Sequence, residues 1–197
     1  MNYLAHLLLA ENTPESQIGN LLGDFVKGRI DQESSLYSQG IIKGIETHFR
    51  VDRFTDTHEI FKWSKNRIYQ SQGRFSGVLI DIFYDHFLAK NWSLFSEENL
   101  ETFAQNIYII LQKNYYLLPK KLQLILPRII LENWLVSYQK TEGIKRTCQR
   151  LAKRIKRPNH CVIAHNDLQH NYHELESDFL LFFPQLVEYV NQNRHTF

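Results

Sequence analysis

The sequence predicts an all-α protein, and three observations support this prediction. Apolar residues recur every three or four positions along most of the chain, which is the spacing of one face of a helix. No segment alternates apolar and polar residues for long, so no strand is required. The 197 residues are 43% hydrophobic and 13% aromatic, which is sufficient for a packed core. No repeat, low-complexity tract or linker interrupts the chain, so we expect a single helical domain over residues 1–197.

The expected helices are separated by polar stretches, glycines and prolines. Thr13 and Pro14 start the second helix, because a threonine side chain can cap a helix and proline suits its first turn. Ser96 is expected to cap the sixth helix and Pro119 to open the seventh, in which Pro127 predicts a kink. The expected helices cover residues 2–11, 14–28, 39–57, 59–70, 78–92, 96–116, 119–138, 142–157, 160–175 and 176–194, with a loop over residues 29–38.

Two glycines, Gly19 and Gly23, interrupt the second expected helix. Each glycine in a helix interior costs about 1 kcal/mol relative to alanine. A common reason for that loss is close approach of the backbone to another helix or to a ligand. We therefore expect one of these two contacts at this block.

The helix expected over residues 78–92 is apolar on all sides, which is typical of a helix buried in the middle of a domain. It nevertheless carries Asp81, Asp85 and His86. Buried carboxylates are normally paired or bound to a metal, and residues four apart lie on one helical face. The pair Asp81 and Asp85 therefore requires either a divalent cation or a basic side chain beside it.

Other acids and histidines also occur in apolar helical surroundings. His48 and Asp52 are four residues apart and project from one helical face. Imidazole and carboxylate are the ligands of Zn, Mn, Fe and similar ions, and a helical bundle can gather them into one interior site. Each residue alone is more readily explained as a hydrogen-bonded core residue, but the whole set favours a metal site. The set comprises His6, Asp24, His48, Asp52, Asp81, Asp85 and His86.

Four blocks of the sequence carry a family resemblance. They are residues 1–7, 19–28, 44–56 and 81–92, in that order. In these blocks the chain resembles the acyl carrier protein phosphodiesterase family, also called acyl carrier protein hydrolase. The resemblance covers about the first 92 residues in register, and the second half is similar only in general pattern.

This resemblance implies a helical bundle related to the HD phosphohydrolase superfamily and dependence on a divalent metal, with manganese favoured. It also implies one reaction, in which the 4′-phosphopantetheine arm is removed from holo acyl carrier protein to leave the apo protein. The superfamily's name reflects an adjacent His-Asp pair, whereas this chain has the reversed order Asp85-His86. The superfamily's ligand assignment is therefore not copied onto this chain.

Metal-dependent hydrolysis of a phosphodiester gives the candidate residues specific roles. Asp52 is expected to orient His48 or to act as a ligand itself. Asp81 is expected to accept a proton from the attacking water. His6 or Lys27 is expected to contact phosphate or to protonate the departing serine oxygen. The expected metal ligands are Asp24, His48, Asp85 and His86.

Two other functions remain open on the sequence. One is an HD-type phosphohydrolase acting on a nucleotide, and the other is a non-enzymatic helical binding protein whose buried acids are ion-paired. Nucleic acid is not an expected partner, because the formal net charge is only +2 and no recognised motif is present. No apolar run is long enough to insert into a bilayer, and two cysteines without a secretory leader favour the cytoplasm.

Charge is distributed unevenly along the chain. Residues 1–98 contain 10 basic and 13 acidic residues, whereas residues 99–197 contain 13 and 8. The basic residues concentrate in residues 144–157, where no acid follows Glu142. Such a face has no internal ion pairs to offset its self-repulsion, so we expect an acidic partner, and the resemblance supplies acyl carrier protein. The expected contact residues are Arg146, Arg150, Lys153, Arg154 and Arg157.

Overall fold

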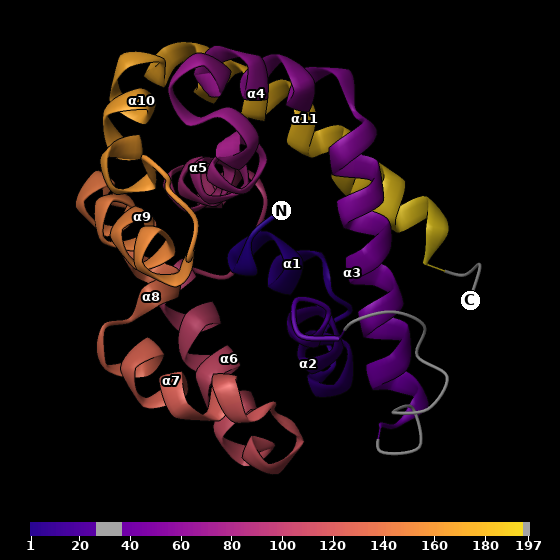
Figure 1. The fold of residues 1–197 in the computed structure, drawn as a ribbon. Coiled ribbons are helices and arrows are strands. Elements are labelled where there is room, and N and C mark those ends of the chain that lie inside the picture. Colours follow the sequence, from indigo (N-terminus) through magenta and orange to yellow (C-terminus); the bar gives the residue numbers. More distant parts are fainter. Residues whose placement is uncertain (27–36, 195–197) are drawn as a thin grey trace.

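A computed structural model describes residues 1–26 and 37–194, and every regular element within these ranges is helical (Figure 1). The prediction of an all-α fold is therefore confirmed. None of these helices is long and apolar enough to cross a membrane. The elements are α1 (Tyr3–Leu9), α2 (Pro14–Leu22), α3 (Gln39–Thr57), α4 (Glu59–Gln72), η2 (Gly73–Phe75), α5 (Ser76–Lys90), η3 (Trp92–Leu94), α6 (Leu100–Lys113), η4 (Tyr115–Leu117), α7 (Lys120–Leu131), α8 (Trp134–Ser137), α9 (Thr141–Arg154), η5 (Cys161–Ile163), α10 (Ala164–His170) and α11 (Tyr172–Asn193).

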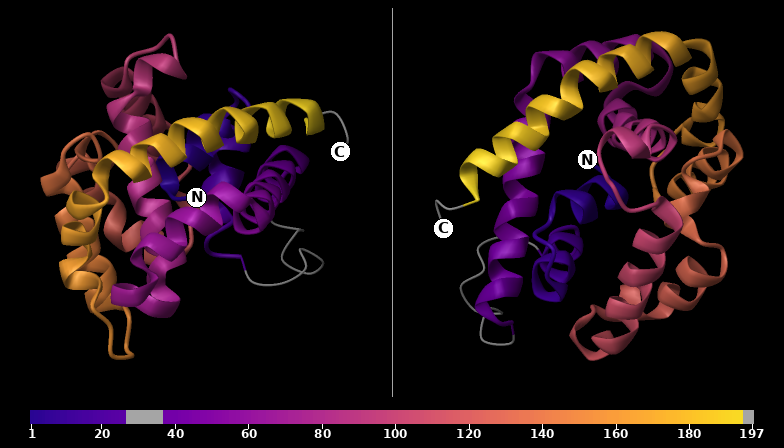
Figure 2. Two further views of the ribbon diagram at one scale, coloured as in Figure 1. Left: turned by 90° about the horizontal axis from the view of Figure 1, so that it is seen from above. Right: turned by 180° about the vertical axis from the view of Figure 1, so that it is seen from behind.

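Helix α5 lies in the centre of the core, as its sequence predicts. Its aromatic side chains Phe83, Tyr84 and Phe87 are completely excluded from solvent. Helix α11 covers α5 with further aromatic rings, and Phe179 contacts both Tyr84 and Phe87. Figure 2 shows α11 running across the back of the molecule, past α4 and α3. This cover places the polar residues of α5 in the interior, where each of them needs a partner.

Helix α1 lies between α3 and α9 in the views of Figures 1 and 2. Its position is fixed by Asp85 of α5, whose carboxylate accepts hydrogen bonds from the backbone N–H groups of Leu4 (2.8 Å) and Ala5 (3.1 Å). N–H groups in the first turn have no partner within their own helix, so this buried carboxylate satisfies two of them. The contact also determines where His6, the next residue, is placed.

Helices α2 and α3 touch through glycine. A Cβ atom on Gly19 would lie 2.2 Å from the carbonyl oxygen of Ile41, and one on Gly44 would lie 2.6 Å from that of Ser16. Both distances are far below van der Waals contact, so a side chain at either position would push the helices apart. The close approach expected from the glycines is therefore confirmed for Gly19, and its partner is α3.

Several helix boundaries differ from the predicted ones. Helix α2 ends at Leu22, before the end of its expected range at residue 28. The cap of α6 is Asn99 rather than Ser96, because the Asn99 side chain accepts the hydrogen bond from the helix backbone (2.8 Å). The helix expected over residues 119–138 is divided at Asn133, whose φ of 44° lies in the left-handed region. The last two helices separate at Asn171, several residues earlier than expected.

Candidate metal centre

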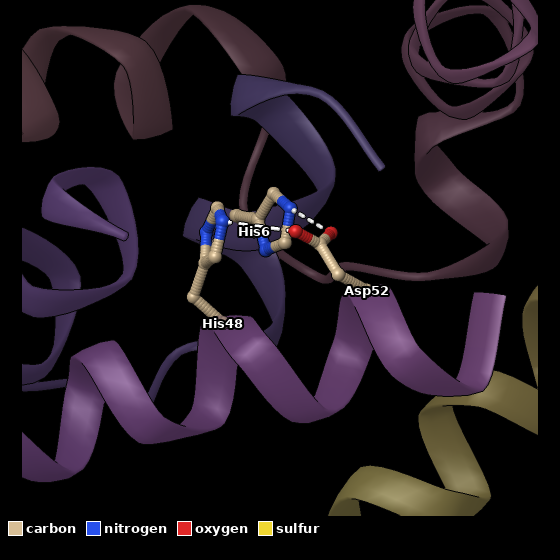
Figure 3. A group of neighbouring side chains, drawn as sticks. All are labelled: His6, His48 and Asp52. Atoms are coloured by element: carbon tan, nitrogen blue, oxygen red, sulfur yellow. Dashed lines mark ion pairs between the residues drawn. The ribbon is translucent and has the colours of Figure 1, made fainter. Parts of the chain in front are cut away.

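Three of the candidate residues converge from two helices, His6 from α1 and the pair His48 and Asp52 from α3 (Figure 3). We call them the triad. The Asp52 carboxylate bridges the two imidazoles, with Oδ1 3.1 Å from Nε2 of His6 and Oδ2 3.1 Å from Nε2 of His48. The imidazole rings stack with their centroids 3.8 Å apart. Both histidines are buried, whereas Asp52 is partly exposed, so the triad lies just inside the surface.

Helix α2 holds His48 in one tautomer. Nδ1 of His48 lies 2.8 Å from the carbonyl oxygen of Asn20, and a carbonyl only accepts, so Nδ1 carries the proton. Gly23 leaves room for the ring, because a Cβ atom there would lie 2.2 Å from Cγ of His48. The second glycine of the block therefore makes space for a site residue, and Nε2 of His48 is directed at Asp52.

The contact between His48 and Asp52 needs a positive charge. With a proton on Nδ1, neutral His48 presents a lone pair at Nε2, and the facing carboxylate oxygen also presents lone pairs. A second proton on the ring or a metal cation removes this repulsion. Burial alone would raise the pKa of Asp52, but the adjacent His48 and His6 imidazoles and the Met1 ammonium hold this pKa well below its usual range. Asp52 is therefore an anion at neutral pH.

His6 is a neutral imidazole, because burial and the adjacent His48 lower its pKa to about 3. Its Nε2 lies 3.1 Å from the backbone oxygen of Met1 and 3.1 Å from Oδ1 of Asp52. Both neighbours are acceptors, so the single proton is on Nε2 and Nδ1 has a lone pair. Nδ1 is buried and has no hydrogen-bond partner within the described ranges. A buried, unpaired imidazole nitrogen is available to bind a metal.

Asp81 of α5 lies beside the triad and shares a cation with it. The α-amino group of Met1 is 3.1 Å from Oδ1 of Asp81 and 3.3 Å from Oδ1 of Asp52. Burial acts to lower the pKa of this ammonium, but the two carboxylates outweigh it and raise the pKa to about 10. Burial raises the pKa of Asp81 above its usual value, and the ammonium opposes part of that rise.

The triad fits a divalent cation. Its three candidate donor atoms, from two imidazoles and one carboxylate, all lie within 4.8 Å of one another. This donor set suits manganese, iron and zinc. The orphaned Nδ1 of His6 and the lone pair on Nε2 of His48 are the atoms that a cation would satisfy. Among the residues that the structure describes, no second group of three such side chains is close enough to hold an ion.

Asp85 and His86, two of the expected ligands, do not belong to the triad, and their side chains bond other partners. Both carboxylate oxygens of Asp85 accept from the α1 backbone, and burial raises the pKa of this carboxyl to about 7. His86 uses both ring nitrogens, Nδ1 at 2.7 Å from the carbonyl oxygen of Tyr138 and Nε2 at 2.8 Å from the hydroxyl of Tyr172. These contacts leave neither nitrogen of His86 free. The geometry thus groups His6 and Asp52, rather than Asp85 and His86, with His48.

Asp24, another expected ligand, lies at the edge of the site, just after α2. The residue reaches solvent, but its carboxyl is shielded enough that desolvation raises its pKa, and His48 partly opposes this rise. This mutual influence places Asp24 within electrostatic range of the triad. Lys27, the expected phosphate contact, falls outside the described residues.

Most of the expected partner-binding residues lie on α9, which ends at Arg154, so Arg157 follows the helix. Arg146, Lys153 and Arg157 are exposed and have no ion pair with any residue in the described part of the chain. Arg154 reaches toward α1. Burial raises the pKa of the Tyr3 phenol there, and the positive charge of the Arg154 guanidinium opposes this rise. The end of α9 therefore adjoins the helix that carries His6.

Arg150 is an exception to the expected free basic face. Its guanidinium forms an ion pair with Glu132 (2.7 Å) and lies 4.0 Å above the ring of Trp134. The basic segment itself supplies no acid, as expected, but Glu132 reaches Arg150 from the α7–α8 connection. Arg150 therefore fastens α9 to α8, and its charge is already paired within the protein.

Comparison with known proteins places the chain in a family. The family model described as acyl carrier protein phosphodiesterase matches residues 1–186. Relatives named acyl carrier protein phosphodiesterase include one from Photorhabdus laumondii, 31% identical over 95% of this chain and 94% of its own. Another, from Serratia proteamaculans, is 33% identical, with 95% and 96% covered, and one from Escherichia coli is 29% identical, with 98% of both chains covered. No solved structure is significantly similar. The chain belongs to the acyl carrier protein phosphodiesterase family.

Proposed function

We propose that the protein hydrolyses the phosphodiester that joins 4′-phosphopantetheine to holo acyl carrier protein, giving the apo protein. The family name supplies the reaction and the substrate. The observation within this chain that carries the proposal is the triad, two imidazoles and an ionised carboxylate whose donor atoms lie within 4.8 Å. Hydrolysis of a phosphodiester requires stabilisation of charge on phosphoryl oxygens and an activated water, which is chemistry that such a donor set supports.

His6, His48 and Asp52 are the residues that would hold a divalent cation, and manganese is the ion that the resemblance favours. When bound, such an ion stabilises phosphoryl charge and lowers the pKa of a water molecule. His6 contributes the buried, unpaired Nδ1. His48 is fixed by its hydrogen bond to Asn20 (2.8 Å), which keeps the lone pair of Nε2 in the site. A hydrogen bond of this kind sets the tautomer of a metal-binding histidine.

Asp81 is the proton acceptor in this proposal. Its raised pKa makes it a stronger base than an ordinary aspartate, and it lies within an ion-pair distance of the same ammonium as Asp52. The departing serine oxygen also needs a proton. A neutral His6, with a pKa of about 3, does not carry the extra proton of an imidazolium. Of the two proton donors considered from the sequence, His6 and Lys27, this leaves Lys27.

The substrate protein also needs a recognition surface. Acyl carrier proteins are small and strongly acidic, as the family resemblance supplies, and α9 presents cations without ion-pair partners in the described structure. Arg146, Lys153, Arg154 and Arg157 are therefore proposed to attract the carrier protein, and Arg150 is not. Charges of this kind act mainly on the association rate and are screened by salt.

Incubation of the purified protein with holo acyl carrier protein tests the proposed reaction. With Mn²⁺ present, we expect mass spectrometry to show loss of the phosphopantetheine arm, and we expect EDTA to prevent it. His48→Ala should prevent the loss while circular dichroism shows that the helices remain. Holo carrier protein that stays intact with Mn²⁺, Mg²⁺, Co²⁺ and Zn²⁺ in turn would overturn the proposed reaction.

A further inference from the structure

A groove of about 470 Å³ lies between α9 and the chain around η5, outside the triad. Gln149, Ala152 and Lys153 of α9 line one side, and Asn159 and Val162 line the other. The lining is mixed, with the basic residue Lys153 on one wall and the aliphatic residue Val162 on the opposite wall. A ligand that fills it must therefore offer both an anion and an apolar group.

The wall formed by α9 is strongly cationic. Arg146, Gln149 and Lys153 are spaced three and four residues apart, so they lie along one row of the helix. Arg146 therefore extends the row of Lys153 beyond the groove. No acidic residue occurs in the sequence between Glu142 and Asp167. Within the described chain, neither Arg146 nor Lys153 has an ion pair, so their charges are free to meet those of a partner.

The opposite wall leaves apolar surface in water. Val162 is 47% exposed and its neighbour Ile163 is 50% exposed. Both residues belong to η5. The completely buried side chain of Cys161 anchors η5 to the core. Two adjacent branched aliphatic side chains held outward by a buried anchor form a small apolar contact surface beside the cationic row.

The geometry points to this groove as the seat of an acidic amphipathic helix of the carrier protein. Lys153 and Arg146 would contact its carboxylates, and Val162 and Ile163 would contact its apolar side chains. A helix presents acidic and apolar residues side by side along its length, which matches the two walls. A single-stranded nucleic acid would instead call for aromatic residues on which bases stack, and none of the described residues that line the groove is aromatic.

The position of the groove also suits the reaction, and the inference rests on the proposed function in this respect. The groove lies along α9, and the next residue after Lys153 is Arg154, whose guanidinium is close enough to the Tyr3 phenol of α1 to lower the pKa of that phenol. A carrier protein seated on α9 is thus beside the helix that contributes His6. Its prosthetic arm can then extend toward the triad while the protein itself remains on the surface.

Direct binding of apo carrier protein, the reaction product, tests the docking site without turnover. Fluorescence anisotropy at low salt should show that Lys153→Glu weakens binding about tenfold, roughly 1.4 kcal/mol. Lys153→Arg should retain the affinity. The matched control is Lys43→Glu, the same charge change at an exposed position of α3 on the other side of α1. Raising the salt concentration should reduce the difference in affinity between Lys153→Glu and Lys43→Glu.

A second matched pair of substitutions tests the apolar wall. Val162→Ser should weaken carrier binding about fivefold, whereas Leu181→Ser, at a 60% exposed site on α11, should not change it. Thermal unfolding of each variant confirms that it is folded. Equal affinities for Lys153→Glu and Lys43→Glu in folded proteins would overturn the docking site. Tighter binding of a single-stranded oligonucleotide than of carrier protein, with the same loss in Lys153→Glu, would also overturn it.

These outcomes are separable from the test of the reaction. Wild-type protein that binds apo carrier protein through Lys153, but releases no arm from the holo form, would contradict the proposed function and leave the docking site in place. Arm release by wild type, together with carrier binding that neither Lys153→Glu nor Val162→Ser weakens, would contradict the docking site alone.

Discussion

Helices α3 and α5 each contribute an aspartate and a buried histidine, but the two pairs have different surroundings. On α3, Nε2 of His48 and Oδ2 of Asp52 face each other at 3.1 Å, with His6 stacked alongside. On α5, Asp85 and His86 turn to separate partners, and every donor and acceptor atom of the two side chains is occupied. The comparison teaches that residue type and burial do not identify a metal ligand. An unpaired lone pair beside other donor atoms is the feature that favours the triad as the proposed metal site.

The two pairs are nevertheless connected through α1. Asp85 holds the first turn of α1 by accepting from Leu4 and Ala5, and His6 follows directly. The α5 pair therefore supports the position of a triad residue, whereas the α3 pair belongs to the proposed metal centre. Substitutions in the two pairs should separate these roles, with loss of turnover for α3 and loss of stability for α5.

The largest effect is expected on α3. His48→Ala or Asp52→Asn should reduce the rate of arm release by at least about a hundredfold, because each removes a donor that the triad needs to hold a cation. The rate is measured by mass spectrometry under saturating Mn²⁺, and circular dichroism should show unchanged helical content. A rate within a few-fold of wild type for either variant would show that this residue does not belong to the triad's chemistry.

The next largest effect is expected on α5. Asp85→Ala should lower the free energy of unfolding by about 3 kcal/mol, because it leaves the N–H groups of Leu4 and Ala5 buried without acceptors. Urea unfolding followed by circular dichroism measures this change. A loss below about 0.5 kcal/mol would indicate that α1 is held mainly by its apolar contacts.

The Asp85 carboxyl also predicts that the free energy of unfolding depends on pH. Burial raises the pKa of Asp85 from 3.8 to about 7, so the folded state binds its proton more tightly than the unfolded state. The stability that this group contributes should therefore fall as the pH rises from about 4 to 7, by at most about 1.4 kcal/mol per pH unit. Asp85→Asn does not titrate, so the advantage of wild type over this variant should shrink across that range. An advantage that grows with pH would contradict the raised pKa.

A smaller effect is expected where α2 makes room for His48. Gly23→Ala would place a Cβ atom 2.2 Å from Cγ of the His48 ring, so the ring must move and turnover should fall about tenfold. Gly77→Ala on α5 is the control, since its new Cβ atom meets nothing closer than Lys65 Cε at 3.9 Å. That variant should keep full turnover and gain about 0.5–1 kcal/mol of stability. Equal turnover in the two variants would mean that Gly23 does not constrain the ring.

The smallest effect on turnover is expected for His86. His86→Gln removes a ring whose two nitrogens bond the Tyr138 carbonyl and the Tyr172 hydroxyl, so stability should fall by about 1–2 kcal/mol. Arm release per folded molecule should stay within a few-fold of wild type. Loss of turnover in a folded variant would return His86 to the set of ligands.

Contacts within one helix could be predicted from the sequence, and contacts between helices mostly could not. The i, i+4 spacing places His48 and Asp52 on one face of α3, and the all-apolar pattern correctly buries α5. Nothing local, however, indicates that His6 joins the α3 pair, because that depends on how α1 is seated. A local signal exists for His48, because the missing side chain of Gly23 makes room for its ring. That signal does not concern His6.

Long-range partners explain the remaining differences. Asp85 is satisfied by N–H groups about eighty residues earlier in the chain, which helical periodicity cannot reveal. Arg150 lies on the basic stripe predicted for α9, but the left-handed turn at Asn133 brings Glu132 within 2.7 Å of its guanidinium. Periodicity identifies the face of a helix on which a side chain lies, whereas the partner on that face is set by the tertiary packing.

The most direct test of the account is a Mn²⁺ titration of three folded proteins: wild type, His48→Ala and His86→Gln. Electron paramagnetic resonance reports free Mn²⁺ and so gives the dissociation constant of each protein. If the triad is the metal centre, His86→Gln should bind like wild type, and His48→Ala should bind at least about tenfold more weakly. Retained binding in His48→Ala, together with lost binding in His86→Gln, would contradict the account and move the centre to α5.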